Sequence, residues 1–321
     1  MLNNYHYFIV LAEELNISRA AKRLYISHQC LSKYLKNLEQ EYGVTFFERN
    51  PQLALTAAGR AYLETLHKIR FLEQNLDSQL QDIRLSKKGL IRLGTTEGRY
   101  RILIPDILAR FKVMYPEVEL DVQYTTSAQL SDRILKNELD LVLLNKSDVS
   151  HNQLEVRPLL NEQLFIVISD SMLASYFPQN YPQCKETFLN GVDLAQFQEI
   201  PFVLNQRGFN SREVLETYMC AREIHLTCVM ELTQLDLHFM LSARNYAASF
   251  CWSMYIPTIQ KMNQDRSLSR LNIFPIKGLN ATNQVVLVAP KGKILPEYGR
   301  ALVRLIRQFC SEYSRIRLDR I

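Results

Sequence analysis

The sequence lacks the segments that would place the protein in a membrane or beyond one. No stretch approaches the ~18 consecutive apolar residues of a membrane-spanning helix. The N-terminus, MLNNYHYFIVLAEE, does not contain the basic and then apolar run of a signal peptide. A cytoplasmic protein with no membrane partner is therefore predicted.

Motifs for catalysis and for metal or cofactor binding are also missing. The six histidines are scattered, and the sequence contains no HExxH, GxSxG or P-loop pattern. Its six cysteines form no CxxC pair and no spacing typical of a metal site, so free and buried thiols are expected. We therefore predict a protein that is not an enzyme and that binds no cofactor and no metal.

The composition is that of an ordinary globular chain. With 321 residues and 47% apolar content, the chain can bury a large core and should divide into two or three domains. The net charge of +5 is modest, so basic residues matter mainly where they cluster.

Residues 17–39, ISRAAKRLYISHQCLSKYLKNLE, contain such a cluster. Ser18 and Ser27 have side chains suited to cap a helix start, which predicts two short consecutive helices. Five bases and no acid lie between Ile17 and Leu38, as expected of a surface that contacts phosphates. This pattern favours a DNA-binding helix-turn-helix, although a pair of solvated basic helices is the alternative.

The following residues support the first interpretation. After Gly43, the segment VTFFERNPQLAL has two short apolar runs around a turn with Asn50 and Pro51, which predicts a β-hairpin wing. Arg49 lies at its tip, where a long cation can reach a phosphate or a minor groove.

Residues 1 to about 60 closely resemble the N-terminal domain of LysR-type transcriptional regulators. The shared features are the AA pair, Leu-x-Ile-Ser, Leu-Ser-Lys, Leu-Glu, Gly-Val, Phe-x-Arg and Leu-Thr-x-x-Gly. The usual Ser-Gln-Pro of the family is replaced by Ser27, His28 and Gln29, followed by Cys30. The expected partner is double-stranded DNA with an inverted-repeat operator. The candidate DNA-binding residues are Ser27, His28, Gln29, Ser32, Lys33, Lys36 and Arg49.

A long helix should follow. Thr56 can cap it, and no proline or glycine occurs between Gly59 and Gly89. A narrow apolar stripe along the helix is typical of pairing with a second helix, although packing on the same chain is the alternative. In the family that the sequence resembles, two subunits pair through this linker helix. The stripe comprises Leu66, Ile69, Leu72, Leu76, Leu80 and Ile83.

Beyond the linker, predicted strands and helices alternate, which indicates an α/β domain with a parallel sheet. This part loosely resembles the effector-binding domain of the same family, which is similar to two-lobed periplasmic binding proteins. The resulting division is a winged helix-turn-helix domain (1–58), a linker and dimerisation helix (59–89) and an effector-binding domain (90–321). Lobe 1 should cover about 90–163 and 268–321, and lobe 2 about 164–267.

Polar residues follow two predicted strands of lobe 1. Thr95 and Thr96 follow the first strand, and Thr126 and Ser127 begin the helix after the second. Because ligands of open α/β sheets bind beyond the C-terminal strand ends, these residues are candidates for an effector site. Hydroxyls and free amides at helix starts suit a small anion, although plain helix capping is the alternative.

The resemblance adds Asn205, at the end of a lobe 2 strand that faces the same cleft in the family. Arg99, Arg101 and Arg207 could add positive charge to this site or lie in solvent, and for each of them solvation is the favoured interpretation. Two segments depart from the family, residues 170–192 and Arg244 to Tyr246, and in the family both border the cleft.

The leading interpretation is a homodimeric, and further homotetrameric, transcriptional regulator that responds to a small-molecule effector. The alternative is a thiol-based redox sensor on the same scaffold that uses Cys220 and Cys228. It is disfavoured because Cys228 falls in a predicted buried strand, where thiols are inert.

Overall fold

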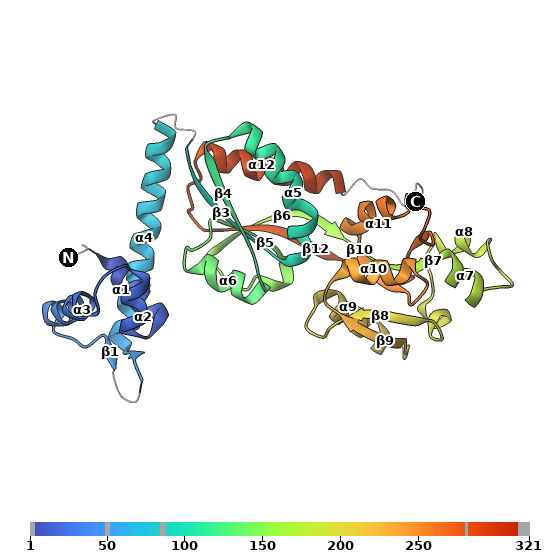
Figure 1. The fold of residues 1–321 in the computed structure, drawn as a ribbon, viewed down its shortest axis with the longest axis horizontal. Coiled ribbons are helices and arrows are strands. Elements are labelled where there is room, and N and C mark those ends of the chain that lie inside the picture. The colour runs from blue at the N-terminus through green and yellow to red at the C-terminus, as the bar shows by residue number, and fades with distance from the viewer. Residues whose placement is uncertain (1–3, 49–51, 84–87, 280–281, 314–321) are drawn as a thin grey trace. The chain divides into compact units, whose positions relative to one another are not determined.

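The computed structural model describes residues 4–48, 52–83, 88–279 and 282–313, and the side chains of 81–83 are outside this description. The chain divides into two compact units: Met1–Ser86 with Gly292–Pro296, and Lys87–Lys291 with Glu297–Ile321. Figure 1 gives the order of the elements. Within the described ranges, none of the helices has the length and hydropathy needed to cross a membrane.

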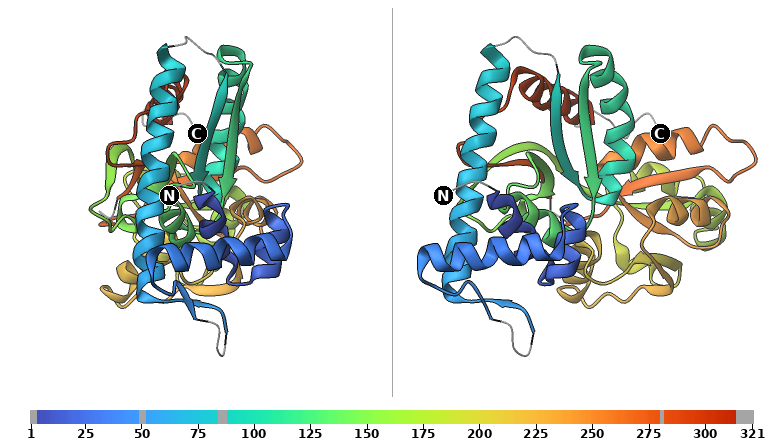
Figure 2. Two further views of the ribbon diagram at one scale, coloured as in Figure 1. Left: turned by 90° about the vertical axis from the view of Figure 1, so that its left-hand side faces the viewer. Right: turned by 60° about the vertical axis from the view of Figure 1, so that its left-hand side comes forward.

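The first unit is a winged helix-turn-helix followed by a long helix. Its elements are α1 (Tyr5–Glu14), α2 (Ile17–Arg23), α3 (His28–Tyr42), β1 (Phe47–Glu48), β2 (Ala54–Leu55) and α4 (Ala57–Ile83). Strands β1 and β2 pair antiparallel, and Figure 2 shows them at the N-terminal end of α4. The predicted wing and the predicted long helix are therefore confirmed.

Capping side chains fix the helix starts in this unit. The Ser27 hydroxyl accepts a hydrogen bond from the Cys30 amide at 3.1 Å, and the Thr56 hydroxyl accepts one from the Gly59 amide at 3.0 Å. The prediction of Ser18 as a cap is wrong, because α2 begins at Ile17, two residues earlier than a helix capped by Ser18 would begin. Its cap is Asn16, whose side chain accepts from the Arg19 amide.

An aromatic core supports the helix-turn-helix. Phe8 on α1 is fully buried and contacts the rings of Phe46, Phe47 and Tyr62. Gly59 passes close beneath this cluster: a Cβ there would lie 2.2 Å from the Phe46 carbonyl oxygen, so a larger residue would displace the wing.

Lobe 1 of the second unit is a sheet of five strands in the order β4-β3-β5-β12-β6. Strand β3 pairs parallel with β4 and β5, whereas β12 is antiparallel to β5 and β6, so the sheet is mixed and not parallel throughout. The elements are β3 (Gly89–Thr95), α5 (Glu97–Met114), β4 (Val118–Tyr124), α6 (Ser127–Leu135), β5 (Leu141–Asn145), the 3-10 turn η1 (Lys146–Asp148), β6 (Leu154–Glu162), β12 (Asn283–Pro290) and α12 (Glu297–Tyr313).

Lobe 2 is built around the fully buried strand β7, which pairs antiparallel with β10 and β11. Strands β8 and β9 form a parallel pair, joined to the β10 side by the Phe202–Ala248 bridge. The elements are β7 (Leu164–Ser169), α7 (Asp170–Tyr176), α8 (Cys184–Phe188), η2 (Leu194–Phe197), β8 (Pro201–Asn205), α9 (Asn210–Cys220), β9 (Thr227–Leu232), α10 (Leu235–Ala243), β10 (Ser249–Trp252), η3 (Ser253–Tyr255), α11 (Ile256–Met262) and β11 (Leu271–Pro275).

The lobe boundary differs from the sequence expectation at the return crossing. The chain enters lobe 2 between β6 and β7. It leaves lobe 2 between β11 and β12, and not at about residue 268, because Leu271–Pro275 pairs with β7 over its whole length. Lobe 2 therefore includes β11.

Candidate functional site

The exposed face of α3 is the candidate nucleic-acid interface. Leu31, Leu35 and Leu38 are buried on one side of the helix. The predicted DNA-binding residues lie on the other side, where all except the half-buried Ser32 are exposed: Ser27, His28, Gln29, Ser32, Lys33 and Lys36. Arg49 lies outside the described residues.

The charges around this face are not all available for phosphates. Arg19 forms an ion pair with Glu14 at 3.3 Å, and Arg23 forms one with Glu13 at 2.7 Å. In the part of the chain that the structure describes, Lys33 and Lys36 form no ion pair. Within the same described residues the exposed Lys22 of α2 forms none either, so the positive charge that is free to meet DNA lies on these three lysines of α2 and α3.

Tyr25 is a candidate that sequence reasoning missed. It lies in the turn between α2 and α3, has a left-handed backbone with φ of 55°, and is 97% exposed. An exposed aromatic ring in an unfavourable backbone conformation is uncommon. Its position in the turn of a helix-turn-helix was the signal in the sequence.

The candidate effector site is a cleft of about 1280 Å³ within the second unit. Residues of both lobes line it, including the first turns of α5 and α6 in lobe 1 and of α9 and α10 in lobe 2. Four predicted residues line this cleft: Thr96, Thr126, Ser127 and Asn205. Thr95 does not line it, because Thr95 is the last residue of β3 and is 0% exposed in the core.

The two threonines differ in how their hydroxyls are used. Thr126 caps α6 by accepting from the Gln129 amide at 3.4 Å. Thr96 precedes α5 but makes no side-chain capping bond, and its hydroxyl accepts instead from Arg99 Nη1 at 3.3 Å. The first amides of α5 therefore have no side-chain acceptor at the cap, as in an anion-binding helix start.

Arg99 is buried, contrary to the expectation that it is solvated. It is 7% exposed and lines the cleft from the first turn of α5. One Nη donates to Asn145 Oδ1 and lies 3.8 Å from a Glu162 oxygen, while Nε has no hydrogen-bond partner. Buried ions need partners, and here the partner comes from β6, far along the sequence.

Glu162 is the buried counterpart of Arg99. It is 3% exposed and accepts a hydrogen bond from Asn283 Nδ2 at 3.1 Å. Burial raises the pKa of Glu162, although Arg99 and the hydrogen bond from Asn283 favour the charged form. The pair anchors α5 to the strands at the base of the cleft.

Arg101 and Arg207 differ from Arg99. Arg101 is half-exposed and bonds both Glu97 on its own helix at 3.0 Å and Asp236 on α10 at 3.3 Å. It therefore spans the cleft from lobe 1 to lobe 2. Arg207 is solvated, as expected, with 82% of its side chain exposed.

Asn205 is held at the end of β8 by a buried arginine. Arg212 Nη1 donates to the Asn205 carbonyl oxygen and to Glu231, both at 2.9 Å. The Asn205 amide donates to the Ser211 hydroxyl at 2.6 Å, and its own Oδ1 has no partner. A residue that is only 8% exposed thus has an unmatched acceptor beside the cleft.

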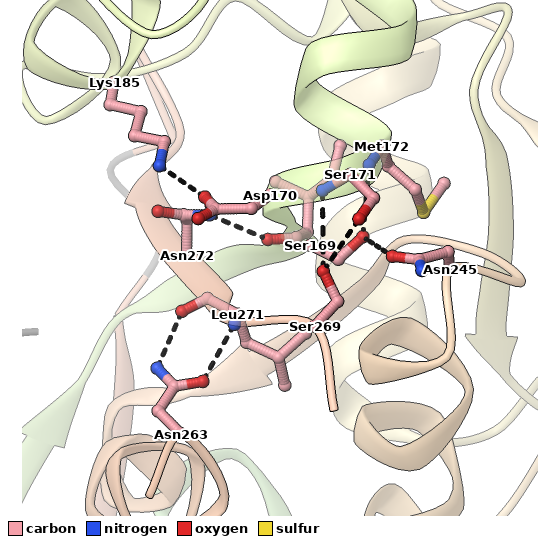
Figure 3. A network of polar contacts seen from close by, with 11 residues as sticks. Ser169, Asp170, Ser171, Met172, Lys185, Asn245, Asn263, Ser269, Leu271 and Asn272 are labelled. Atoms are coloured by element: carbon pink, nitrogen blue, oxygen red, sulfur yellow. Dashed lines mark hydrogen bonds and ion pairs between the residues drawn. The ribbon is translucent and has the colours of Figure 1, made fainter. Parts of the chain in front are cut away.

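The two segments that depart from the family do not border the cleft, contrary to expectation. Figure 3 shows a polar network within lobe 2 that holds residues of both segments. Ser169 donates to Asn245 Oδ1 at 2.6 Å, and Asp170 binds both Lys185 and Asn272. The described cleft lining includes no residue from 170–192 or 244–246, because these segments pack on the end of β7.

The thiols also differ from expectation. Cys228 is exposed, because β9 is the edge strand of its pair and residues 227–231 are all exposed. Cys220 at the end of α9 is exposed as well, and both are free. Among the described residues, no group of three or more His, Cys, Asp or Glu side chains could hold a metal ion.

Comparison with protein families identifies the class. Residues 2–60 match the bacterial regulatory helix-turn-helix protein family of lysR type, and residues 85–311 match the LysR substrate binding domain. The chain belongs to the LysR family of transcriptional regulators. It is therefore a DNA-binding regulator with an effector-binding domain, and such regulators are not enzymes.

Individual relatives are distant. The transcriptional activator CmpR of Synechocystis is 25% identical over 234 residues, which is 72% of each chain. The regulator YnfL of Escherichia coli is 26% identical over 90% of this chain and 92% of its own. Among solved structures, full-length OxyR of Pseudomonas aeruginosa has a TM-score of 0.67 at 18% identity, covering 94% of this chain and 95% of that one. CbnR complexed with its target DNA has a TM-score of 0.53 at 19% identity, covering 94% and 97%. At these identities the structures establish the fold alone.

Proposed function

We propose that the protein is a cytoplasmic, ligand-responsive transcription factor that binds an inverted-repeat operator as a dimer, with α3 in the major groove. The exposed face of α3, which lacks acidic residues in its first turns, supports this proposal most strongly. CbnR, a protein of the same fold, has been crystallised with its target DNA, and this also supports DNA as the partner.

The proposed division of labour is a DNA-binding domain (1–58), a dimerisation helix (59–89) and an effector domain (90–321). On α4, Leu66 is buried in the first unit, whereas Leu72, Leu76 and Leu80 are 65%, 53% and 39% exposed. A row of exposed leucines on one helix supports pairing with the same helix of a second subunit. The Ile83 side chain lies outside the described residues. Two such dimers would form the proposed tetramer.

The proposed effector is a small molecule with an anionic group. Support comes from the buried Arg99, whose Nε lacks a partner, and from the α5 start, where Thr96 makes no capping bond. Thr126, Ser127 and Asn205 line the same cleft. A ligand bound across the cleft would favour one lobe spacing and so one arrangement of the paired DNA-binding domains.

Lys33→Ala and Gln29→Ala should each weaken specific operator binding, because both side chains project from the first turns of α3 toward base edges. A bidentate base contact is worth ~1–3 kcal/mol, so a loss of this size is expected in fluorescence anisotropy with operator DNA. Lys68→Ala and Gln40→Ala, at exposed positions of the same unit, are the matched controls. If operator affinity stays at the wild-type value in both test variants, the recognition face is assigned wrongly.

Thr96→Val should abolish the effector response at nearly constant side-chain volume, because it removes a hydroxyl at the α5 start. Thr126→Val should act in the same direction. The measurement is the effector-induced change in operator affinity, with operator affinity in the absence of effector expected to be retained. Thr217→Val, on the exposed side of α9 outside the cleft, is the control. An undiminished response in both test variants would refute this site.

The thiol-based alternative is supported by one observation, namely that Cys220 and Cys228 are both exposed. Exposure makes oxidation possible in a way that burial would not. Replacing both with serine tests this alternative. A redox mechanism requires that the double variant lose an oxidant-dependent change in operator binding.

A further inference from the structure

The charges that line the cleft are unbalanced. Among its described lining residues, two guanidinium groups face five carboxylates, a formal net charge of −3. These groups are Arg99, Arg101, Glu97, Asp148, Glu162, Glu213 and Asp236. A ligand with anionic groups alone would enter an environment of its own sign.

Ion pairing within the cleft uses both arginines. Arg99 is paired with Glu162, and Arg101 is shared between Glu97 and Asp236. In the described part of the chain, Asp148 and Glu213 have no cationic partner. They lie on opposite lobes, Asp148 at the end of η1 in lobe 1 and Glu213 in the first turn of α9 in lobe 2.

Asp148 is held in a fixed position, unlike a surface carboxylate. One of its oxygens accepts hydrogen bonds from the Ser127 hydroxyl at 2.7 Å and from Asn145 Nδ2 at 3.2 Å. Asn145 in turn accepts from Arg99, so the carboxylate is fixed relative to the buried arginine. Glu213 is exposed, and a helix start favours an acid there in any case, so its contribution is secondary.

A second feature independently indicates a hydrogen-bond donor on the ligand. Asn205 Oδ1 is a buried acceptor without a donor on a side chain that is only 8% exposed and lines the cleft. An unmatched buried acceptor is costly, and a ligand N–H would satisfy it once the Asn205 amide, whose Oδ1 has almost no exposed surface in this structure, turns toward the cleft. Aromatic rings also favour a cationic ligand group. The ring centroids of Tyr100 and Tyr124 lie 4.8 Å apart, both residues line the cleft, and ring faces attract cations.

We propose that the effector carries a protonated amine in addition to its acidic group. This inference rests on the proposed function, in which the acidic group meets Thr96 and Arg99. The amine binds the Asp148 carboxylate, and an N–H of the ligand reaches Asn205 across the cleft. The ligand class is thus a zwitterion of the amino-acid type, and not a simple carboxylate.

The test uses the full-length protein and matched probes. The twenty common L-amino acids, the carboxylic acids that lack their α-amino groups and the amines that lack their carboxyl groups are compared by thermal shift and calorimetry. At least one amine-bearing acid should bind, and about tenfold more tightly than its deaminated analogue, as expected for a hydrogen bond to a charged group. Its binding should also change operator affinity.

Substitutions of the cleft carboxylates test which side chain binds the amine of the ligand. Asp148→Asn should weaken binding of the zwitterionic probe about tenfold and leave binding of the deaminated acid unchanged. Glu213→Gln, at an exposed position where folding is not at risk, should weaken the same probe by about half an order of magnitude, as expected for a solvated charge. Glu119→Gln, an exposed acid outside the cleft, should change neither.

The outcomes separate this inference from the function on which it rests. If deaminated acids bind as tightly as their parents and alter operator binding, the amine is refuted and the regulator remains. The inference also fails if no amine-bearing probe binds, or if Asp148→Asn does not weaken the binding of one that does. If the wild-type protein shows no specific operator binding under any condition, the proposed function itself is contradicted.

Discussion

Replacing Leu72 and Leu76 together with lysine is expected to separate the paired subunits and to lower operator affinity by roughly a hundredfold or more, since linked binding modules gain 10²–10⁴ in avidity. Both side chains are more than half exposed, so the monomer loses little packing when they change. In the dimer, by contrast, four ammonium groups would face one another along the seam. Analytical ultracentrifugation gives the mass, and fluorescence anisotropy gives the affinity.

Asp77→Lys is the matched control for this experiment. It alters the charge of α4 by the same two units as the double variant, but at an exposed polar position off the leucine row. The control should sediment as the wild-type oligomer. A Leu72→Lys/Leu76→Lys protein that also sediments as wild type would rule out α4 as the dimer seam.

The second large effect is expected from Arg99→Met, which should lower the free energy of unfolding by ~3–5 kcal/mol, because it leaves the Glu162 carboxylate buried without its partner. Arg101→Met, which removes two half-exposed and solvent-screened ion pairs, with Glu97 and with Asp236, should cost at most ~1 kcal/mol. Urea unfolding at pH 7 measures both. Equal losses in the two variants would contradict the assignment of a buried pair.

Two further measurements identify the cause of that loss. Adding Glu162→Gln to Arg99→Met should recover much of the stability, because no charge then remains buried. The Arg99→Met defect should also shrink at acidic pH. Without Arg99 the pKa of Glu162, already raised by burial, rises further, so the folded state retains the proton and its relative stability is lost as pH increases.

Local patterns in the sequence were sufficient to predict most elements of the first unit. Ser27 and Thr56 were identified as caps because capping is decided within four residues, and the wing was recognised from two apolar runs around a turn. The prediction of Ser18 as a helix cap was wrong for the same local reason. Asn16, two residues earlier, also has a side chain suited to cap α2, and it is the residue that does so.

The lining of the cleft could be predicted only in part, because it depends on contacts between distant residues that the sequence does not reveal. Thr96 and Thr126 could be found because strand ends and helix starts are local features, whereas Asn205 was found through the family resemblance. The burial of Arg99 on α5 could not be found, because it depends on Glu162 of the distant strand β6, and an isolated arginine is usually solvated. The exposure of Cys228 was missed because an apolar run does not indicate whether a strand lies at the edge of a sheet.

Arg101 pairs with one acid on each lobe, Glu97 and Asp236, and this arrangement affects the movement of the lobes. When the lobes separate, the contact with Asp236 breaks, but Arg101 keeps Glu97 on its own helix, so no cation is left without a counter-ion. Opening therefore costs at most ~1 kcal/mol from this contact, less in salt. Ligand contacts worth only a few times the thermal energy would then suffice to bias the hinge toward the closed position.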